Sequence, residues 1–420
     1  MEKHLNILVS AYSCSPNWGS EPGMAWNWIT NLSNHFKIHL ITNTEFKDDL
    51  LNGLESGGLN ERIQVYFNDI GEQATIMGKN QGDWRFYYYY RKWQKTTYKM
   101  AKNIINSNDI LLVHQLNMIG FREPGFLWKL DKPSVWGPVG GMNFMPSNFI
   151  SQAPFLTQVK LNLKNFINFL QINFSLHVSR AIKNFDIIVG AVNNSKESIK
   201  KYKGIDIPVL NETGANYGII QEHGKRDFYN GDFNILWVGK SMFRKQFTLA
   251  LDIILKVSNL DGIKFHVVGI EKNEKVYAFY KEFIEANNLE NVIVWHGKIP
   301  QQKVSEMMRN FQLFLFTSIE EGTPHVIMEA IENKLPCICF DTCGQGECVN
   351  DNIGIKIEMV DPKSSIKDFS KAINRLYKKR DVLEKMSLNC IERSKELSWE
   401  SKTQRMLEFY KEAINKYEKS

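Results

Sequence analysis

Short runs of apolar, often β-branched residues alternate along the chain with longer stretches whose apolar residues recur at helical spacing. This alternation is typical of βαβ units, in which helices join parallel strands. Two series of runs are visible. The first comprises residues 5–12, 37–43, 62–68, 109–115, 132–138, 185–191 and 207–210, and the second comprises residues 232–239, 263–269, 292–297, 312–318 and 335–341. The sequence therefore predicts an α/β protein with two parallel sheets.

A polar, glycine-containing stretch over residues 214–232 separates the two series. It has few apolar residues to bury, as expected of a linker between domains. A chain of 420 residues also has about the length of two ordinary domains. We place the boundary near residue 225, with a first domain over residues 1–225 and a second over residues 226–397. A helical pattern follows at about residues 398–420.

The composition excludes several classes of protein. With 43% hydrophobic and 23% charged residues it is typical of a soluble globular chain. No run reaches the roughly 18 apolar residues of a membrane-spanning helix, and we interpret the opening residues as a first strand, not a signal peptide. Six cysteines are too few for a disulfide scaffold and favour a reducing cytoplasm. The net charge of +6 is modest and no nucleic-acid motif is present, so nucleic acid is not an expected partner.

Four of the cysteines cluster in the second domain, at Cys337, Cys339, Cys343 and Cys348. A metal site would favour paired Cys-x-x-Cys spacing, which this segment lacks. Cys337 and Cys339 alternate inside the strand-like residues 335–341, as small buried apolar residues do. We expect core residues here and no metal, with a metal site as the alternative.

Paired carboxylates follow the fourth run of the second series. Residues 320–330 read EEGTPHVIMEA, so seven residues separate Glu321, before a short helix, from Glu329, inside it. A carboxylate accepts two hydrogen bonds at once, so Glu321 can hold neighbouring sugar hydroxyls and Glu329 a ribose diol. The alternative is that both acids only complement the helix dipole.

The start of this helix is a candidate phosphate site. Gly322 and Thr323 form a turn, and Pro324 stands where the helix begins, a position at which its missing N–H costs nothing. The free N–H groups around His325 and Val326 then suit an anion such as a phosphate.

Two cations follow the first strand of the second series. Lys240 comes directly after the strand, and Lys245 stands five residues later at the start of a helix. Two fixed cations can neutralise the charge that develops on a leaving diphosphate when no metal is bound. Solvated surface lysines are the alternative, and the position at the carboxyl end of a strand favours the binding role.

The first domain offers weaker signals. Gly19 and Gly23 lie in the segment 13–28 between the first strand and the first helix, where glycine lets the backbone approach a phosphate or sugar. No Gly-x-Gly-x-x-Gly pattern is present. His114 ends a strand, where its imidazole can face a ligand, although a lone histidine is more often a structural residue.

Two of these segments, EGTPHVIMEA and VGKSMFRK (238–245), together resemble the retaining glycosyltransferases of family 4, which have the GT-B fold. SPNWGSEPG (15–23), VWGPVGG (135–141) and LSWE (397–400) are similar to a bacterial branch of that family that makes polysaccharides and glycolipids. The resemblance covers essentially the whole chain. It implies two Rossmann-like domains facing a central cleft, an acceptor-binding first domain, a donor-binding second domain, and a C-terminal helix that crosses back to the first domain.

The resemblance also implies roles for individual residues. Glu321 would contact the donor hexose, Glu329 the ribose, and Lys240 and Lys245 the diphosphate. His114 matches the histidine that approaches the transferred sugar. Lys240 stands where the family usually has arginine, and so lacks a bidentate fork.

Further matches lie in loops. Gly19 matches a glycine loop of the acceptor domain, which we count with the donor-binding residues, and Lys298 and Ile299 match a segment whose backbone meets the nucleotide base. Pro324 stands where the family commonly has glycine, so that position cannot donate an N–H. Residues 211–216, NETGAN, replace the usual Asn-Gly-x-Asp, and their role stays open.

The function implied is transfer of a sugar, with retention and without a metal or other cofactor, from a UDP- or GDP-linked donor to a glycan or lipid-linked acceptor. Its setting would be the synthesis of bacterial surface polysaccharide or glycoconjugate. A sugar-nucleotide epimerase of the same fold and a catalytically silent sugar-nucleotide-binding protein are the alternatives.

Charge and apolar residues are combined in two segments of the first domain. Residues 79–102 carry seven lysines and arginines among aromatics and one acid, and residues 151–185 contain no acid. Leu156, Val159 and Leu163 recur at helical spacing beside Lys160 and Lys164. Such a helix either lies in the interface of an anionic membrane or packs on the sheet. We expect a cytoplasmic protein that is peripheral on the inner face of the membrane.

Overall fold

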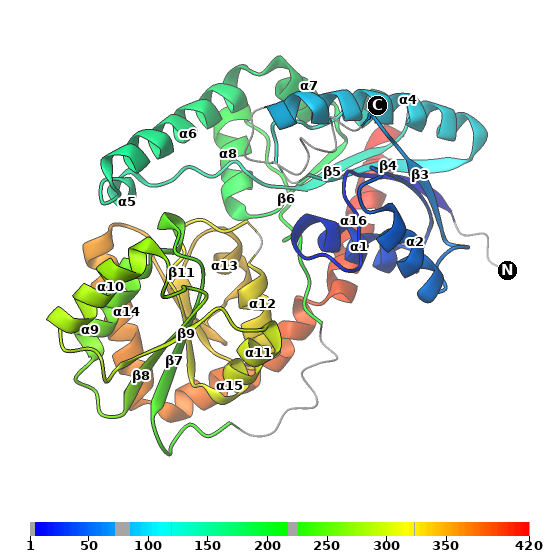
Figure 1. Cartoon of the computed structure of the whole chain (residues 1–420). Helices are drawn as coiled ribbons and strands as arrows, with labels where there is room; N and C mark the ends of the chain where they lie inside the picture. Colours follow the sequence, from blue (N-terminus) through cyan, green and yellow to red (C-terminus); the bar gives the residue numbers. More distant parts are fainter. Residues whose placement is uncertain (1–4, 72–84, 119, 217–225, 323, 420) are drawn as a thin grey trace. The chain divides into compact units, whose positions relative to one another are not determined.

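The computed structural model describes residues 5–71, 85–118, 120–216, 226–322 and 324–419 (Figure 1). The chain divides into two compact units. Unit 1 comprises Met1–Asn143, Phe166–Glu212 and Trp399–Ser420, and unit 2 comprises Phe144–Asn165 and Thr213–Ser398. Each unit has its own six-stranded sheet, in which all neighbouring strands are parallel. The two predicted parallel sheets are thereby confirmed.

Unit 1 has the strand order β3-β2-β1-β4-β5-β6. Its strands are β1 (Asn6–Ala11), β2 (Lys37–Thr42), β3 (Ile63–Phe67), β4 (Ile110–Asn117), β5 (Ser134–Val139) and β6 (Ile187–Gly190). Its helices include α1 (Ser20–Leu32), α2 (Lys47–Ser56), α4 (Arg85–Ser107), the 3₁₀ turn η1 (Leu127–Lys129), α7 (Leu176–Asn184), α8 (Asn193–Lys203) and α16 (Trp399–Tyr417). The expected strand over residues 207–210 is only an isolated bridge between Val209 and Gly190.

Helices cover both faces of this sheet because its strands are apolar on both sides. In β1, Ile7 and Val9 belong to a core cluster with α1, α2 and α16, whereas Leu8 belongs to a second cluster with α4 and α7. The final helix α16 buries Phe409 and Tyr410 in the first of these clusters. The helix at the end of the sequence therefore completes unit 1, as the fold class predicts.

Unit 2 has the strand order β12-β11-β10-β7-β8-β9. Its strands are β7 (Phe233–Val238), β8 (Ile263–Val268), β9 (Ile293–Gly297), β10 (Leu313–Phe316), β11 (Cys337–Phe340) and β12 (Gly354–Ile357). Its helices include α5 (Ser147–Ile150), the 3₁₀ turn η3 (Phe243–Lys245), α9 (Phe247–Val257), α10 (Lys275–Ala286), α11 (Gln301–Asn310), α12 (His325–Glu332), α13 (Cys343–Cys348), α14 (Pro362–Lys378) and α15 (Arg380–Glu396). Strand β12 is absent from the predicted series.

The segment Phe144–Asn165 groups with unit 2, although the sequence places it in the first domain. Met145, Phe149 and Ile150 belong to the same core cluster as the strands of unit 2, and the Phe149 ring meets Phe340 of β11 edge-on at 5.6 Å. Apolar contact with a core distant in sequence thus decides the membership of this segment.

Helix α6 (Phe155–Phe174) contains the division between the units and buries only Asn168 and Ile172. Leu156, for example, is 81% exposed. The other large exposed apolar residues of this region are Phe155, Val159, Leu163, Phe166, Ile167, Phe169, Leu170, Phe174 and Leu176. The predicted apolar stripe is therefore not packed into a core. Across the described residues, no helix combines the length and apolarity needed to cross a membrane.

All six cysteines are buried, and none forms a disulfide. Cys337, Cys339, Cys348 and Cys390 belong to one apolar core cluster of unit 2. Among the described residues, no three His, Cys, Asp or Glu side chains are grouped so that they could hold a metal ion.

Candidate active site

The strand order of unit 2 reverses between β7 and its neighbour β10. In open α/β sheets, ligands bind outside the carboxyl ends of the strands at such a switch point. The chain leaves β7 through Gly239 toward η3, and leaves β10 through Thr317 toward α12. Both connections carry residues expected to bind the donor, so the sheet topology brings the predicted segments together.

Glu321 is the centre of this site, because two cations converge on its Oε2 atom. Lys245 Nζ lies 2.8 Å from Oε2, and Arg244 Nη1 donates a second hydrogen bond to the same oxygen. The Ser318 hydroxyl lies 3.2 Å from it. The side chains of Glu321 and Lys245 are only 14% and 12% exposed. A charge-assisted pair this well shielded is stronger than an ion pair on the open surface.

Backbone bonds hold the two connections against each other. The Ile319 N–H donates to the Arg244 carbonyl at 2.9 Å, and the Thr317 hydroxyl donates to the Lys245 carbonyl at 2.8 Å. The Gly344 N–H, at the start of α13, donates to the Glu321 carbonyl at 3.0 Å. The acid and the cations are thus positioned by main-chain contacts as well as by their own ion pairs.

Gly344 is also required by close packing. A Cβ atom at this position would lie 2.6 Å from the Gly322 carbonyl oxygen and 2.6 Å from Pro324 Cδ. The loop that carries Glu321 therefore rests directly on the backbone of α13. Pro324 is the residue before α12 rather than its first residue, and His325 begins the helix with an exposed side chain. Thr323 lies outside the described residues.

A left-handed residue forms the turn from η3 into α9. Gln246 has φ +49° and ψ +49°, and its side-chain Nε2 donates to the Phe243 carbonyl at 2.9 Å. Glycine is the residue that adopts this conformation without steric cost. The turn places Lys245 at the amino end of α9, where burial lowers the pKa of its ammonium group while Glu321 opposes that shift.

Glu329 has a partner of its own. Its Oε1 accepts a hydrogen bond of 2.7 Å from Gln301 Nε2, at the start of α11. Burial raises the pKa of this carboxyl, and the bond from Gln301 lowers it in part. Val326, one turn earlier on α12, packs against the core cluster of this face. The two acids therefore lie in different surroundings, Glu321 with cations and Glu329 with a neutral amide.

The cations that contact Glu321 are Arg244 and Lys245. The Lys240 side chain is exposed and makes no hydrogen bond or ion pair with any described residue, whereas Arg244 and Lys245 both bind Glu321. Arg244 was missed because Lys240 and Lys245 have the expected spacing. The sequence did contain an indication of Arg244: it directly precedes Lys245, and its guanidinium can form the two parallel hydrogen bonds that Lys240 cannot.

The segment expected to meet a base follows β9. The backbone N–H of Lys298 donates to Glu271 Oε1 at 3.1 Å, and the Lys298 side chain is exposed. Ile299 is half-buried against the core cluster that contains Val304. Both residues lie at the carboxyl edge of the sheet in unit 2.

His114 in unit 1 lies inside β4 (Ile110–Asn117) and not at the end of the strand, where the sequence placed it. Its side chain is fully buried, Nδ1 lies 2.7 Å from the Tyr410 hydroxyl, and Nε2 lies 2.7 Å from the Gly137 carbonyl. Burial lowers the pKa of this imidazole to about 4. The two ring nitrogens therefore connect β4 to β5 and α16 in the core of unit 1. Gly19, the residue before α1, has open space at its Cβ position.

Solved structures with the same two-sheet architecture identify the fold class of this chain. A glycosyltransferase from Rickettsia africae ESF-5 superposes with a TM-score of 0.62 at 14% identity, covering 98% of this chain and 99% of that one. HepE from Anabaena, solved in complex with UDP, gives 0.57 at 12% identity over 96% and 99%. These similarities show the GT-B fold.

Comparison of sequences adds a match to a protein family and to curated relatives. Residues 219–397 match the family model "Glycosyl transferases group 1". A lipopolysaccharide 1,6-galactosyltransferase from Salmonella typhimurium is 29% identical over 145 residues, which are 34% of this chain and 38% of that enzyme. The alignment thus spans little more than a third of the relative.

Proposed function

We propose that this protein transfers a sugar from a UDP- or GDP-linked donor to a glycan or lipid-linked acceptor, in the synthesis of a bacterial surface polysaccharide or glycolipid. The observation that carries the proposal is the convergence of Arg244 and Lys245 on Glu321 where β7 and β10 end. The family match over residues 219–397 supports it, since that range contains all three residues.

In the proposed mechanism, Arg244 and Lys245 bind the donor diphosphate. A guanidinium and an ammonium fixed in a shielded site stabilise the charge that develops on the leaving group without reorganising. Glu321 shares these cations and offers its carboxylate to hydroxyls of the transferred sugar. Glu329, which is bonded to a neutral amide and not to a cation, accepts from the ribose diol.

We propose that transfer retains the configuration of the sugar and uses no metal. The bond between the anomeric carbon and the diphosphate oxygen breaks, and the acceptor oxygen forms its bond on the same face. The acceptor's proton passes to the departing diphosphate oxygen, so no protein base is required. The scheme assigns no proton transfer to His114, whose two ring nitrogens lie within hydrogen-bond distance of Tyr410 and Gly137.

We propose further that the acceptor is presented at the cytoplasmic face of an anionic membrane. The exposed apolar residues of α6, together with the absence of any acid from residues 151–185, suit the interface of such a bilayer. Lys164 is already paired with Glu320 at 2.7 Å, so the cation available on this part of α6 is the exposed Lys160.

A donor screen by thermal shift tests the donor class. A ligand at about 100 times its dissociation constant adds roughly 2.7 kcal/mol to the stability of the state it binds. We expect a shift with UDP or GDP sugars. Incubation of the bound donor without acceptor then separates a transferase, which leaves the sugar unchanged, from an epimerase, which isomerises it. A donor that binds but never reacts with any acceptor would indicate a silent binding protein.

A further inference from the structure

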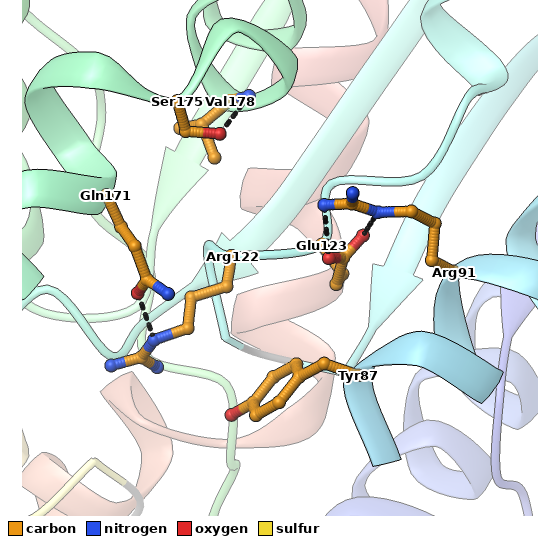
Figure 2. Close-up of a pocket in the computed structure, with 7 residues that line it drawn as sticks. All are labelled: Tyr87, Arg91, Arg122, Glu123, Gln171, Ser175 and Val178. Carbon is orange, nitrogen blue, oxygen red and sulfur yellow. Dashed lines mark hydrogen bonds and ion pairs between the residues drawn. The ribbon is translucent and has the colours of Figure 1, made fainter. Parts of the chain in front are cut away.

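Unit 1 contains a cavity of about 250 Å³ between α4, the segment after β4, α6 and the start of α7 (Figure 2). Tyr87 and Arg91 line it from α4, Arg122 and Glu123 from the segment after β4, and Gln171 from α6. None of these residues takes part in the donor site of unit 2. Because the cavity follows the carboxyl end of β4, it lies at the edge of the sheet where α/β proteins bind ligands.

Arg122 is held in one orientation beside this cavity. Its Nε donates to Gln171 Oε1 at 2.6 Å, and Nη2 donates to Asn168 Oδ1. Asn168 is itself buried and fixed by a 3.1 Å bond to the Asn143 carbonyl. The guanidinium carbon lies 5.2 Å from the centre of the Phe121 ring. Nη1 has no partner among the described residues, so a positioned cation keeps donors for a ligand.

The charge around the cavity is positive. Glu123 is the acid that lines it, and Arg91 neutralises it through two bonds, Nε to Oε2 at 2.9 Å and Nη2 to Oε1 at 2.6 Å. Lys95 and Lys129 add further positive charge near the cavity. Lys95 interacts electrostatically with Glu123, and both lysines interact electrostatically with the neighbouring His177. Burial and these cations lower the pKa of His177 to about 4. With Glu123 paired, Arg122 and the two lysines are left to attract an anion.

Apolar side chains flank the cavity on the same elements. Phe174, which precedes the lining residue Ser175, is 70% exposed, and Leu176, which follows it, is 71% exposed. On α4, Tyr88 is exposed beside Tyr87. Figure 2 shows the Tyr87 ring and the Arg122 guanidinium among the side chains that line the cavity. The Tyr87 hydroxyl has no hydrogen-bond partner among the described residues, so it too can donate to a ligand.

We propose that this cavity binds the phosphate group of a lipid-linked acceptor, with Arg122 and Tyr87 donating to the phosphate and Phe174 and Leu176 contacting the lipid. Arginine recognises phosphate through directional, charge-assisted hydrogen bonds, and a fixed arginine does so with less loss of side-chain freedom. This inference rests on the proposed function, because only a transferase has an acceptor. It places the acceptor's phosphate in unit 1, at a site separate from the cations of unit 2 that we propose bind the donor diphosphate.

The test measures binding alone, so that it is independent of turnover. Geranyl phosphate, geraniol and inorganic phosphate are titrated by calorimetry into the full chain, with UDP present in excess to occupy the donor site. The variants are Arg122→Gln, which keeps a hydrogen-bonding side chain but removes the charge, and Arg122→Lys. Arg180→Gln is the matched control, because Arg180 is exposed on α7 and does not line the cavity.

We expect Arg122→Gln to weaken geranyl phosphate binding about tenfold or more, Arg122→Lys to weaken it less, and Arg180→Gln to leave it unchanged. Geraniol should bind weakly and equally to all four proteins, and a thermal melt verifies folding of each variant. Equal affinity of the parent and Arg122→Gln for geranyl phosphate overturns the proposal. Inorganic phosphate binding as tightly as geranyl phosphate overturns the lipid assignment.

The two proposals fail separately. Loss of geranyl phosphate binding in Arg122→Gln, in a protein that never transfers sugar, supports the phosphate site and contradicts the proposed function. If the parent and Arg122→Gln transfer sugar to a lipid acceptor at the same rate and bind geranyl phosphate equally, the function is supported and the phosphate site is contradicted.

Discussion

Lys245 Nζ lies 2.8 Å from Glu321 Oε2, and this pair joins the connection after β7 to the connection after β10. Arg244 binds the same carboxylate oxygen from the neighbouring position in sequence. Because one acid faces two cations, the group of three keeps a net positive charge. In the proposed function, this positive charge attracts the donor diphosphate, and Glu321 binds the sugar that the diphosphate carries.

The first prediction separates the two cations at Glu321 from the exposed Lys240. Arg244→Ala and Lys245→Ala should each weaken binding of the nucleoside diphosphate about tenfold or more, because each removes a charge from the diphosphate site. Binding of the nucleoside should change much less. Lys240→Ala is the control and should stay within about threefold of the parent for both ligands. Calorimetry with equal losses for nucleoside and diphosphate, or a larger loss for Lys240→Ala, would contradict this assignment.

The second prediction concerns the glycine beneath the Glu321 loop. Gly344→Ala places a Cβ atom 2.6 Å from the Gly322 carbonyl, so the loop must shift. We expect kcat/KM to fall at least tenfold, because displacement of a positioning loop by an ångström is costly. Gly19→Ala is the matched control for folding, since nothing lies within 4 Å of its Cβ position, and it should keep the parent's melting temperature. Unchanged kinetics of Gly344→Ala would show that the loop position does not matter.

The third prediction is a pH dependence of stability from Glu332 on α12. This carboxyl is 8% exposed and accepts a 2.5 Å bond from the Asn216 N–H. Burial raises its pKa from 4.5 to about 7, and the Glu329 charge adds to the shift. The folded state thus holds the proton more tightly than the unfolded state. The contribution of Glu332 to the free energy of unfolding is therefore full below about pH 4.5 and is lost as the pH rises to about 7.

Urea denaturation at steps between pH 4 and 8 measures this effect by comparing the parent with Glu332→Gln. The difference between the two midpoints should change in favour of the variant as the pH rises through this window. Parallel midpoint curves would show that Glu332 titrates alike in the folded and unfolded chain. Glu212, whose pKa burial also raises, to about 8, is present in both proteins and cancels in the comparison.

The fourth prediction tests the membrane proposal. Sedimentation with liposomes that contain anionic lipid should decrease with added salt, and should be lost when Leu156→Ser, Lys160→Glu and Leu163→Ser are combined. Lys164 is left in place because Glu320 pairs with it. The control combines Lys385→Glu and Leu388→Ser, an exposed cation and an exposed apolar residue on α15. If the amount of protein that sediments with liposomes does not depend on lipid charge, on salt or on the α6 substitutions, a soluble acceptor is favoured.

The sequence predicted the sheets because strands follow local patterns, and it singled out Glu321 and Lys245, whose side chains the structure places in contact. In the described part of the chain, eleven of the twelve strands follow apolar runs, and Lys245 and Glu321 lie in the connections after two of these strands, β7 and β10. Strand β12, of sequence GIKI, is short and carries Lys356, so its pattern is too weak to stand out. Arg244 was not predicted, because Lys240 already stood at the expected distance from Lys245 in the sequence.

Other features depend on contacts that no local pattern contains. The contact of buried His114 with Tyr410 joins residues 296 positions apart, and β4 continues to Asn117, beyond the strand end that the sequence suggested. The helical spacing of Leu156, Val159 and Leu163 predicted α6, but only the structure shows that these side chains are exposed. Helical periodicity identifies an apolar face and leaves open whether it packs on protein or on lipid.

Sugar transfer by Glu321→Gln shows whether Glu321 stabilises the transition state of a retaining transfer. The parent and the variant are incubated with the donor selected by thermal shift and with a glycan or lipid-linked acceptor, and the product's linkage is determined by NMR. Glu320→Gln, next to it in sequence, is the control. We expect a product of retained configuration, and a loss of about 100-fold or more in kcat/KM for Glu321→Gln alone, or roughly 2.7 kcal/mol of transition-state stabilisation. Activity of Glu321→Gln within about threefold of the parent, under 1 kcal/mol, would contradict it.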